Sequence, residues 1–113
     1  MKKLISLSFT LVVLATAPEA FAKINSADIR AARSLFQSSG CTSCHDATGS
    51  AAGPSLKAIA KRYKGKPVIT ELAQRIREGS QGRWGDLSHP AIDYLTPTDA
   101  SMLAEWILNG APL

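Results

Sequence analysis

The stretch Gly40-Cys41-Thr42-Ser43-Cys44-His45 contains both cysteines of the chain and one of its two histidines. Two thiols three residues apart can reach neighbouring points on one edge of a planar ligand, and the imidazole that follows can point at the centre of that ligand. The same three side chains could instead form a disulfide or contribute to a metal site. Features elsewhere in the sequence are needed to distinguish between these possible roles.

The order Cys-x-x-Cys-His is the attachment signature of c-type haem. The thiols of Cys41 and Cys44 would form thioether bonds to the two vinyl groups of the porphyrin, and His45 would then lie under the iron and donate an imidazole nitrogen to it. We therefore expect one covalent haem c, bound through Cys41 and Cys44, with His45 as its proximal iron ligand.

Three other arrangements of these residues stay open at this point. A redox-active disulfide between Cys41 and Cys44 would be expected in a βαβ context, which the sequence lacks. A zinc site could use both cysteines with His45 and His89, but known zinc spacings keep ligands apart, whereas Cys44 and His45 are adjacent. A plain structural disulfide is the third. An absorption spectrum would separate all three from haem.

The first 22 residues have the layout of a secretory signal peptide. Lys2 and Lys3 form a positive start, Leu4 to Ala17 is largely apolar, and Ala20-Phe21-Ala22 has the form of a cleavage site. An uncleaved anchor is the alternative, but the run is short for a bilayer span of about 20 residues. We expect a signal peptide at 1–22, one domain at 23–113, a periplasmic location and no stable membrane insertion after cleavage.

The remaining sequence predicts four helices and no convincing strand. Their apolar residues recur at helical spacing, and the ranges are about 26–37, a helix from about 55, a helix from about 70 to Gly79, and a helix from Thr96 to Gly110. The last is the best marked, because Thr96, Pro97 and Asp99 form a capping box with proline at the first helical position. Residues 80–95 read as a loop. The predicted class is all-α, with about four helices around one covalent haem.

The charge balance is only mildly basic. The formal net charge is +4, and it becomes +3 when Lys2, Lys3 and Glu19 are removed with the predicted signal peptide. This surplus is too small to indicate nucleic-acid binding. The sequence does contain one local basic patch, made of Lys57, Lys61, Arg62, Lys64 and Lys66. This patch is either a docking surface for an acidic redox partner or a solvated helix face.

Together these segments resemble a small bacterial monohaem class I cytochrome c, over about Ile29 to Leu108. The segments that carry the resemblance surround the Cys-x-x-Cys-His stretch on both sides. They are Leu35-Phe36, Gly53-Pro54, Ala73-Gln74-Arg75-Ile76, Gly79-Ser80-Gln81-Gly82, Trp84-Gly85 and Leu103-Ala104-Glu105-Trp106-Ile107-Leu108.

The resemblance implies roles for individual residues. The Pro54 carbonyl would accept a hydrogen bond from the proximal histidine, which would fix its ring and tautomer. Phe36 and Trp106 would meet where the first and last helices cross. Arg75 and Trp84 match positions that donate hydrogen bonds to a haem propionate, although Arg75 could instead lie on a solvated helix face and Trp84 could be a core aromatic.

One departure from this family concerns the second axial ligand. The family pattern W-G-x-x-P-M-P-P supplies a methionine, whereas this chain reads Trp84-Gly85-Asp86-Leu87-Ser88-His89-Pro90-Ala91 and has His89 at that place. Met102 falls in the last helix, beside its apolar face, and is expected to pack there. We therefore predict that His45 and His89 are the two metal ligands.

The predicted function is periplasmic one-electron transfer without enzymatic activity. Imidazole favours ferric iron more than a thioether does, so the reduction potential should be lowered. The main alternative is a haem protein that binds or senses a small ligand by displacing His89. A peroxidase-like enzyme is a weaker alternative, because no distal arginine or asparagine lies beside His89 in the sequence.

Overall fold

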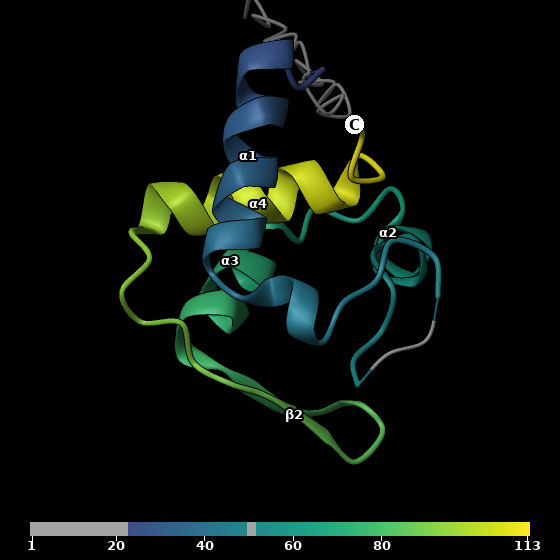
Figure 1. The fold of residues 1–113 in the computed structure, drawn as a ribbon. Coiled ribbons are helices and arrows are strands. Elements are labelled where there is room, and N and C mark those ends of the chain that lie inside the picture. The colour runs from purple at the N-terminus through teal and green to yellow at the C-terminus, as the bar shows by residue number, and fades with distance from the viewer. Residues whose placement is uncertain (1–22, 50–51) are drawn as a thin grey trace, which may run out of the picture.

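The computed structural model describes residues 23–49 and 52–113, and the predicted signal peptide lies outside the described residues. Four helices, one short 3₁₀ helix and a two-stranded hairpin follow one another along the chain (Figure 1). They are α1 (Ser26–Ser38), η1 (Cys41–Ser43), α2 (Leu56–Tyr63), α3 (Ile69–Glu78), β1 (Ser80–Trp84), β2 (Leu87–His89) and α4 (Pro97–Leu108). The prediction of a mostly helical fold with four helices is confirmed.

Helix α4 is the centre of the fold, since α1, α2 and α3 all pack against it. On one face Ala100 and Ala104 are fully buried against Ala73 of α3, and these small side chains let the two helices approach closely. On another face Leu103 and Trp106 belong to the main apolar cluster with residues of α1 and α2. One helix therefore organises both parts of the core.

The first and last helices, α1 and α4, cross each other (Figure 1), and an aromatic contact joins them. The ring centroids of Phe36 and Trp106 lie 5.3 Å apart, with an angle of 57° between the ring planes. This tilted arrangement is favourable because the edge of one ring meets the face of the other. The two residues therefore meet as the resemblance implied, and both side chains are buried.

The helix ends follow local capping chemistry. At α4 the Thr96 side chain accepts a hydrogen bond from the Asp99 backbone, and the Asp99 carboxylate accepts one from the Thr96 backbone, so the predicted capping box is present. Ser55 caps α2. At α1 the cap is Asn25, one residue before the expected Ser26.

The prediction that residues 80–95 form a loop without strands is wrong. Strands β1 and β2 pair antiparallel, with Ser80 opposite His89 and Trp84 opposite Leu87, and the register shifts between Gln81 and Trp84. Gly85, at φ 69°, is the first residue of the two-residue connection, where tight hairpins often need a positive φ. The strands show no apolar alternation because their residues are exposed or only half-buried.

Within residues 23–49 and 52–113, no helix is long and apolar enough to cross a membrane.

Substitution Thr96→Ala should weaken the helix on which the others pack. Losing the cap leaves the Asp99 backbone N–H without its acceptor, and we expect a fall of about 1 kcal/mol in the free energy of unfolding. Denaturant unfolding of the haem-loaded protein measures it. Thr96→Ser is the matched control, because it keeps the hydroxyl and should retain most of the stability. Equal midpoints for Thr96→Ala and the unsubstituted protein would show that this cap contributes nothing.

Candidate haem-binding site

A cavity of about 320 Å³ lies among η1, the three later helices and the hairpin. Cys41, Cys44 and His45 line it from one side, while Trp84 and His89 line it from the hairpin. Its other walls are mainly apolar side chains from α2, α3 and α4, including Ile59, Ile76 and Leu103. The structure therefore brings the first motif and the distant His89 to one space.

The two cysteines lie on a tight turn that begins at Gly40. This glycine has φ 75°, a conformation that other residues rarely adopt, and the short helix η1 follows directly. Both thiols are free, with Cys41 half-buried and Cys44 exposed. Burial raises the pKa of the Cys41 thiol. Neither disulfide alternative is present in this structure.

His45 is held in one orientation by its neighbours. Its Nδ1 donates a hydrogen bond of 2.7 Å to the Pro54 carbonyl, and since a carbonyl can only accept, Nδ1 carries the proton. Nε2 is therefore the nitrogen with a free lone pair. Gly53 makes this approach possible, because a Cβ there would lie 3.1 Å from Cε1 of His45 and 3.1 Å from the Cys44 carbonyl oxygen.

His89 lies at the end of β2 and faces His45 across the cavity. The centroids of the two imidazole rings are 6.0 Å apart, and their planes make an angle of 31°. Within the part of the chain that the structure describes, His89 Nδ1 is buried without a hydrogen-bond partner. Burial also lowers the pKa of His89, which favours the neutral ring.

The backbone around His89 is packed tightly against Gly79. A Cβ at position 79 would lie 2.7 Å from the His89 carbonyl oxygen, and Gly79 also has φ 80°. Both facts require glycine there. From the sequence, Gly79 was expected to end a helix and to belong to a segment that resembles the family, but its contact with the His89 backbone was not predicted.

The structure also bears on the zinc alternative and on the expected position of Met102. In residues 23–49 and 52–113, no group of three or more His, Cys, Asp or Glu side chains is placed to hold a metal ion, which contradicts the zinc alternative. Met102 packs against the main apolar cluster, as expected, and does not line the cavity.

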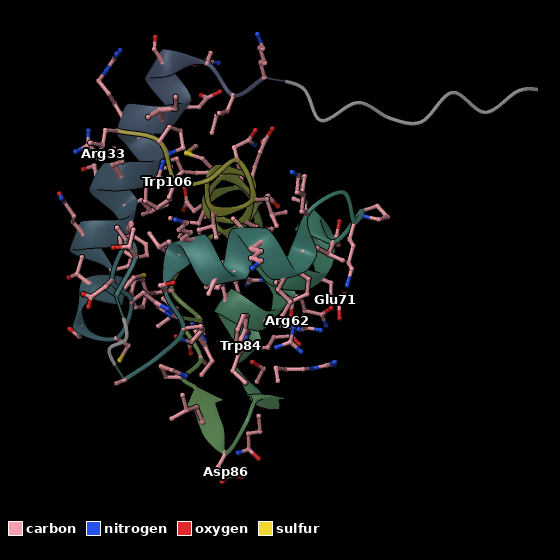
Figure 2. All side chains as sticks on the ribbon, turned by 90° about the vertical axis from the view of Figure 1, so that its right-hand side faces the viewer. Arg33, Arg62, Glu71, Trp84, Asp86 and Trp106 are labelled. Atoms are coloured by element: carbon pink, nitrogen blue, oxygen red, sulfur yellow. The ribbon has the colours of Figure 1, made fainter. Side chains whose placement is uncertain are left out.

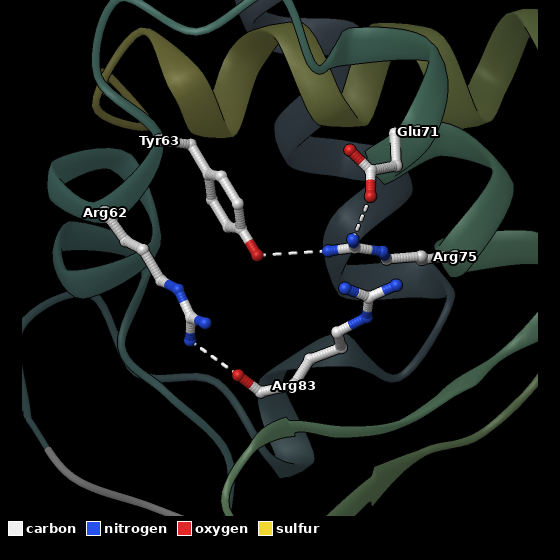
Figure 3. Close-up of polar contacts among 5 residues, drawn as sticks. All are labelled: Arg62, Tyr63, Glu71, Arg75 and Arg83. Carbon is white, nitrogen blue, oxygen red and sulfur yellow. Dashed lines mark hydrogen bonds and ion pairs between the residues drawn. The ribbon is translucent and has the colours of Figure 1, made fainter.

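Arg75 and Trp84 both line the cavity, but each also has a protein partner. Arg75 donates a hydrogen bond of 3.0 Å to the Tyr63 hydroxyl and forms an ion pair with Glu71 (Figure 3). The indole of Trp84 lies under the guanidinium of Arg62. Figure 2 shows Arg62, Glu71 and Trp84 in one region, above Asp86 at the tip of the hairpin.

One basic residue of the cavity wall was not predicted from the sequence. Arg83, on β1, lines the cavity together with Arg75, and both side chains are labelled in Figure 3. A single arginine in an apparent loop carries no sequence signal, and only the hairpin brings Arg83 to the cavity.

The residues around the cavity fit a haem. Cys41 and Cys44 offer two free thiols, the lone pair of His45 is on Nε2, and a second imidazole with a buried, unpartnered nitrogen faces it. The apolar walls suit the porphyrin, and Arg75 and Arg83 can hold its carboxylates. Bound there, haem supplies a centre that gains and loses one electron.

Known proteins match most of the described chain. The family model described as cytochrome c matches residues 29–111. Cytochrome c-551 of Pseudomonas aeruginosa is 38% identical over 76 residues, which are 66% of this chain and 72% of that protein. Cytochrome c-552 of Hydrogenobacter thermophilus is 37% identical over 76 residues, 66% of this chain and 76% of that protein.

The fold matches as well. The crystal structure of wild-type Nitrosomonas europaea cytochrome c552 aligns with a TM-score of 0.65 at 35% identity, over 69% of this chain and 98% of that one. The matched region includes Cys41, Cys44 and the cavity they line. The chain therefore belongs to the cytochrome c family, as an electron carrier with one covalently bound haem c and not an enzyme.

Proposed function

We propose that this cytochrome c is a periplasmic one-electron carrier whose haem iron is ligated by His45 and His89. One observation carries the proposal: the two imidazoles line the same cavity with their centroids 6.0 Å apart. Metal–nitrogen bonds of about 2 Å from two opposed imidazoles would put the ring centres roughly 6 Å apart. The spacing therefore suits one metal ion between the two rings.

The proximal side would be fixed by the contact between His45 and Pro54. Because Nδ1 donates to the carbonyl, Nε2 is left to bind the metal, and the hydrogen bond makes that nitrogen a better donor. The thiols of Cys41 and Cys44 would hold the porphyrin edge. Arg75, Arg83 and Trp84 would face its carboxylates from the opposite wall of the cavity.

The distal side would be occupied by His89 because no described methionine competes for it. Met102 is in the core, and the position that resembles the family's methionine holds His89. Imidazole in place of a thioether should lower the reduction potential on the order of 0.1–0.3 V, within the wide range that axial ligands control. Such a carrier suits low-potential electron donors.

The cellular location belongs to the proposal too. Residues 1–22 have the order of a secretory signal peptide, and residues 23–113 would form the exported domain. Export would bring the chain to the compartment where its redox protein partners are met.

Substitution His89→Met is the direct test of the distal ligand. The ferric form of the unsubstituted protein should be low-spin and lack the weak long-wavelength absorption band of methionine-bound ferric haem. His89→Met should create that band and raise the potential on the order of 0.1–0.3 V. Met102→Leu is the matched control, and it should change neither the spectrum nor the potential.

Substitution His89→Ala tests the same ligand by removal. With the sixth position open, the ferric form should bind added imidazole, and the reduced form should take up carbon monoxide readily. If His89 is not a ligand, the unsubstituted protein will already be high-spin or water-ligated, and His89→Ala will barely alter its spectrum. That result would favour the alternative function, a haem protein that binds or senses small ligands.

We propose further that the basic patch on α2 and after it docks an acidic redox partner. Its five side chains, Lys57, Lys61, Arg62, Lys64 and Lys66, are all exposed. Tyr63 and Ile59 of the same helix line the cavity, so a partner bound at this patch would be near the haem. Complementary charge mainly speeds encounter between such partners.

Lys61→Glu should slow electron exchange with the physiological partner. The loss should be largest at low ionic strength and fade as salt screens charges beyond about 10 Å at 0.1 M. Arg30→Glu is the matched control, since it makes the same change of charge at an exposed position on α1. Rates measured by stopped flow that do not depend on salt, or equal losses in both variants, would leave the patch as a solvated helix face.

A further inference from the structure

The hairpin that carries His89 projects from the helical body (Figure 1). At its base, Gly79 packs on the backbone of His89, and the Ile92 N–H donates a hydrogen bond of 3.0 Å to the Ile76 carbonyl. These contacts are made by backbone atoms at the base of the hairpin and do not hold the imidazole ring of His89, whose Nδ1 has no partner among the described residues. They do not reach the region near the tip, where Trp84 pairs with Leu87, so a different contact has to fix that region.

Arg62 of α2 contacts the hairpin at that outer region. Its Nη1 donates a hydrogen bond of 2.6 Å to the Arg83 carbonyl (Figure 3). The same guanidinium lies over the indole of Trp84, with its central carbon 4.4 Å from the ring centroid. One side chain from a helix thus holds two consecutive residues of β1.

The shape of the guanidinium explains why this residue can make both contacts. Its N–H groups lie in one plane and can donate within that plane, while its flat face stacks on an aromatic ring. A lysine at this position could provide charge but not a planar group that does both. The central carbon of the same guanidinium also lies 5.6 Å from the ring centroid of Tyr63, its neighbour on α2, which lines the cavity.

We propose that Arg62 is a positioning residue that fastens the outer part of the hairpin to α2 and so keeps His89 over the cavity. Trp84 and His89 lie on paired strands and both line the cavity, so a hairpin free to swing at Trp84 would move the distal wall. The consequence for iron ligation rests on the proposed function, whereas the fastening itself does not.

The test uses the full haem-loaded protein with Arg62→Ala, Arg62→Lys and the control Arg30→Ala, an exposed arginine on another helix. Amide hydrogen exchange over residues 80–89 reports how often the hairpin opens. The rate of carbon monoxide binding to the reduced protein reports how often His89 leaves the cavity. Circular dichroism checks that each variant retains its helices.

Arg62→Ala should raise both rates by about tenfold, the size expected from losing one hydrogen bond and one cation–π contact. Arg62→Lys should resemble Arg62→Ala, because charge without the planar group does not restore the fastening. Arg30→Ala should resemble the unsubstituted protein in both measurements.

Unchanged hydrogen exchange in Arg62→Ala would overturn the proposal. So would rates of hydrogen exchange and carbon monoxide binding in Arg62→Lys that equal those of the unsubstituted protein. Failure of the proposed bis-histidine ligation gives a different pattern. In that case the unsubstituted protein already binds carbon monoxide without delay, while hydrogen exchange in the hairpin still reports whether Arg62 fastens it.

Discussion

The helices of this chain pack around a space that they do not fill. Their buried residues form a small cluster on α4 and an alanine contact between α3 and α4, and the cavity lies beside both. A chain of this size buries little surface and needs a further source of stability. Covalent haem supplies an apolar plate there. The cavity wall therefore continues the core. Leu103 and Ile76 both pack in the main apolar cluster and line the cavity.

The proximal and distal walls differ in how the sequence encodes them. On the proximal side Cys41, Cys44 and His45 lie in one short motif, so local spacing was sufficient to predict that they act together, while the contact of His45 with Pro54 was implied by the family resemblance. Helix α4 was equally predictable, because its capping signals are local. The distal wall depends on contacts between residues far apart in the chain, such as Arg62 with Arg83. No local sequence pattern predicts those contacts. The hairpin was not predicted either, because its mostly exposed strands show no apolar alternation.

The hairpin and the histidine are physically linked. In the pattern that this chain resembles, the residue before the axial ligand is proline, which has no N–H and is disfavoured in a strand ladder. Here Ser88 takes that place and pairs with Gln81 across the hairpin. A proline-rich loop is rigid because its φ angles are fixed. This chain obtains order at the same position from strand pairing and from the close contact at Gly79.

Charge adds a second link between the hairpin and the cofactor. Arg83 brings a guanidinium to the cavity wall where Arg75 already lies, and of these two only Arg75 has a carboxylate partner among the described residues, namely Glu71. Two like charges on the wall of one cavity repel each other, so the wall would be more stable with an anion beside them. In the proposed arrangement the haem carboxylates would be that anion. Cofactor binding would then involve charged as well as apolar residues of the cavity wall, and it would draw the hairpin toward the helices through β1, the strand that Arg62 contacts.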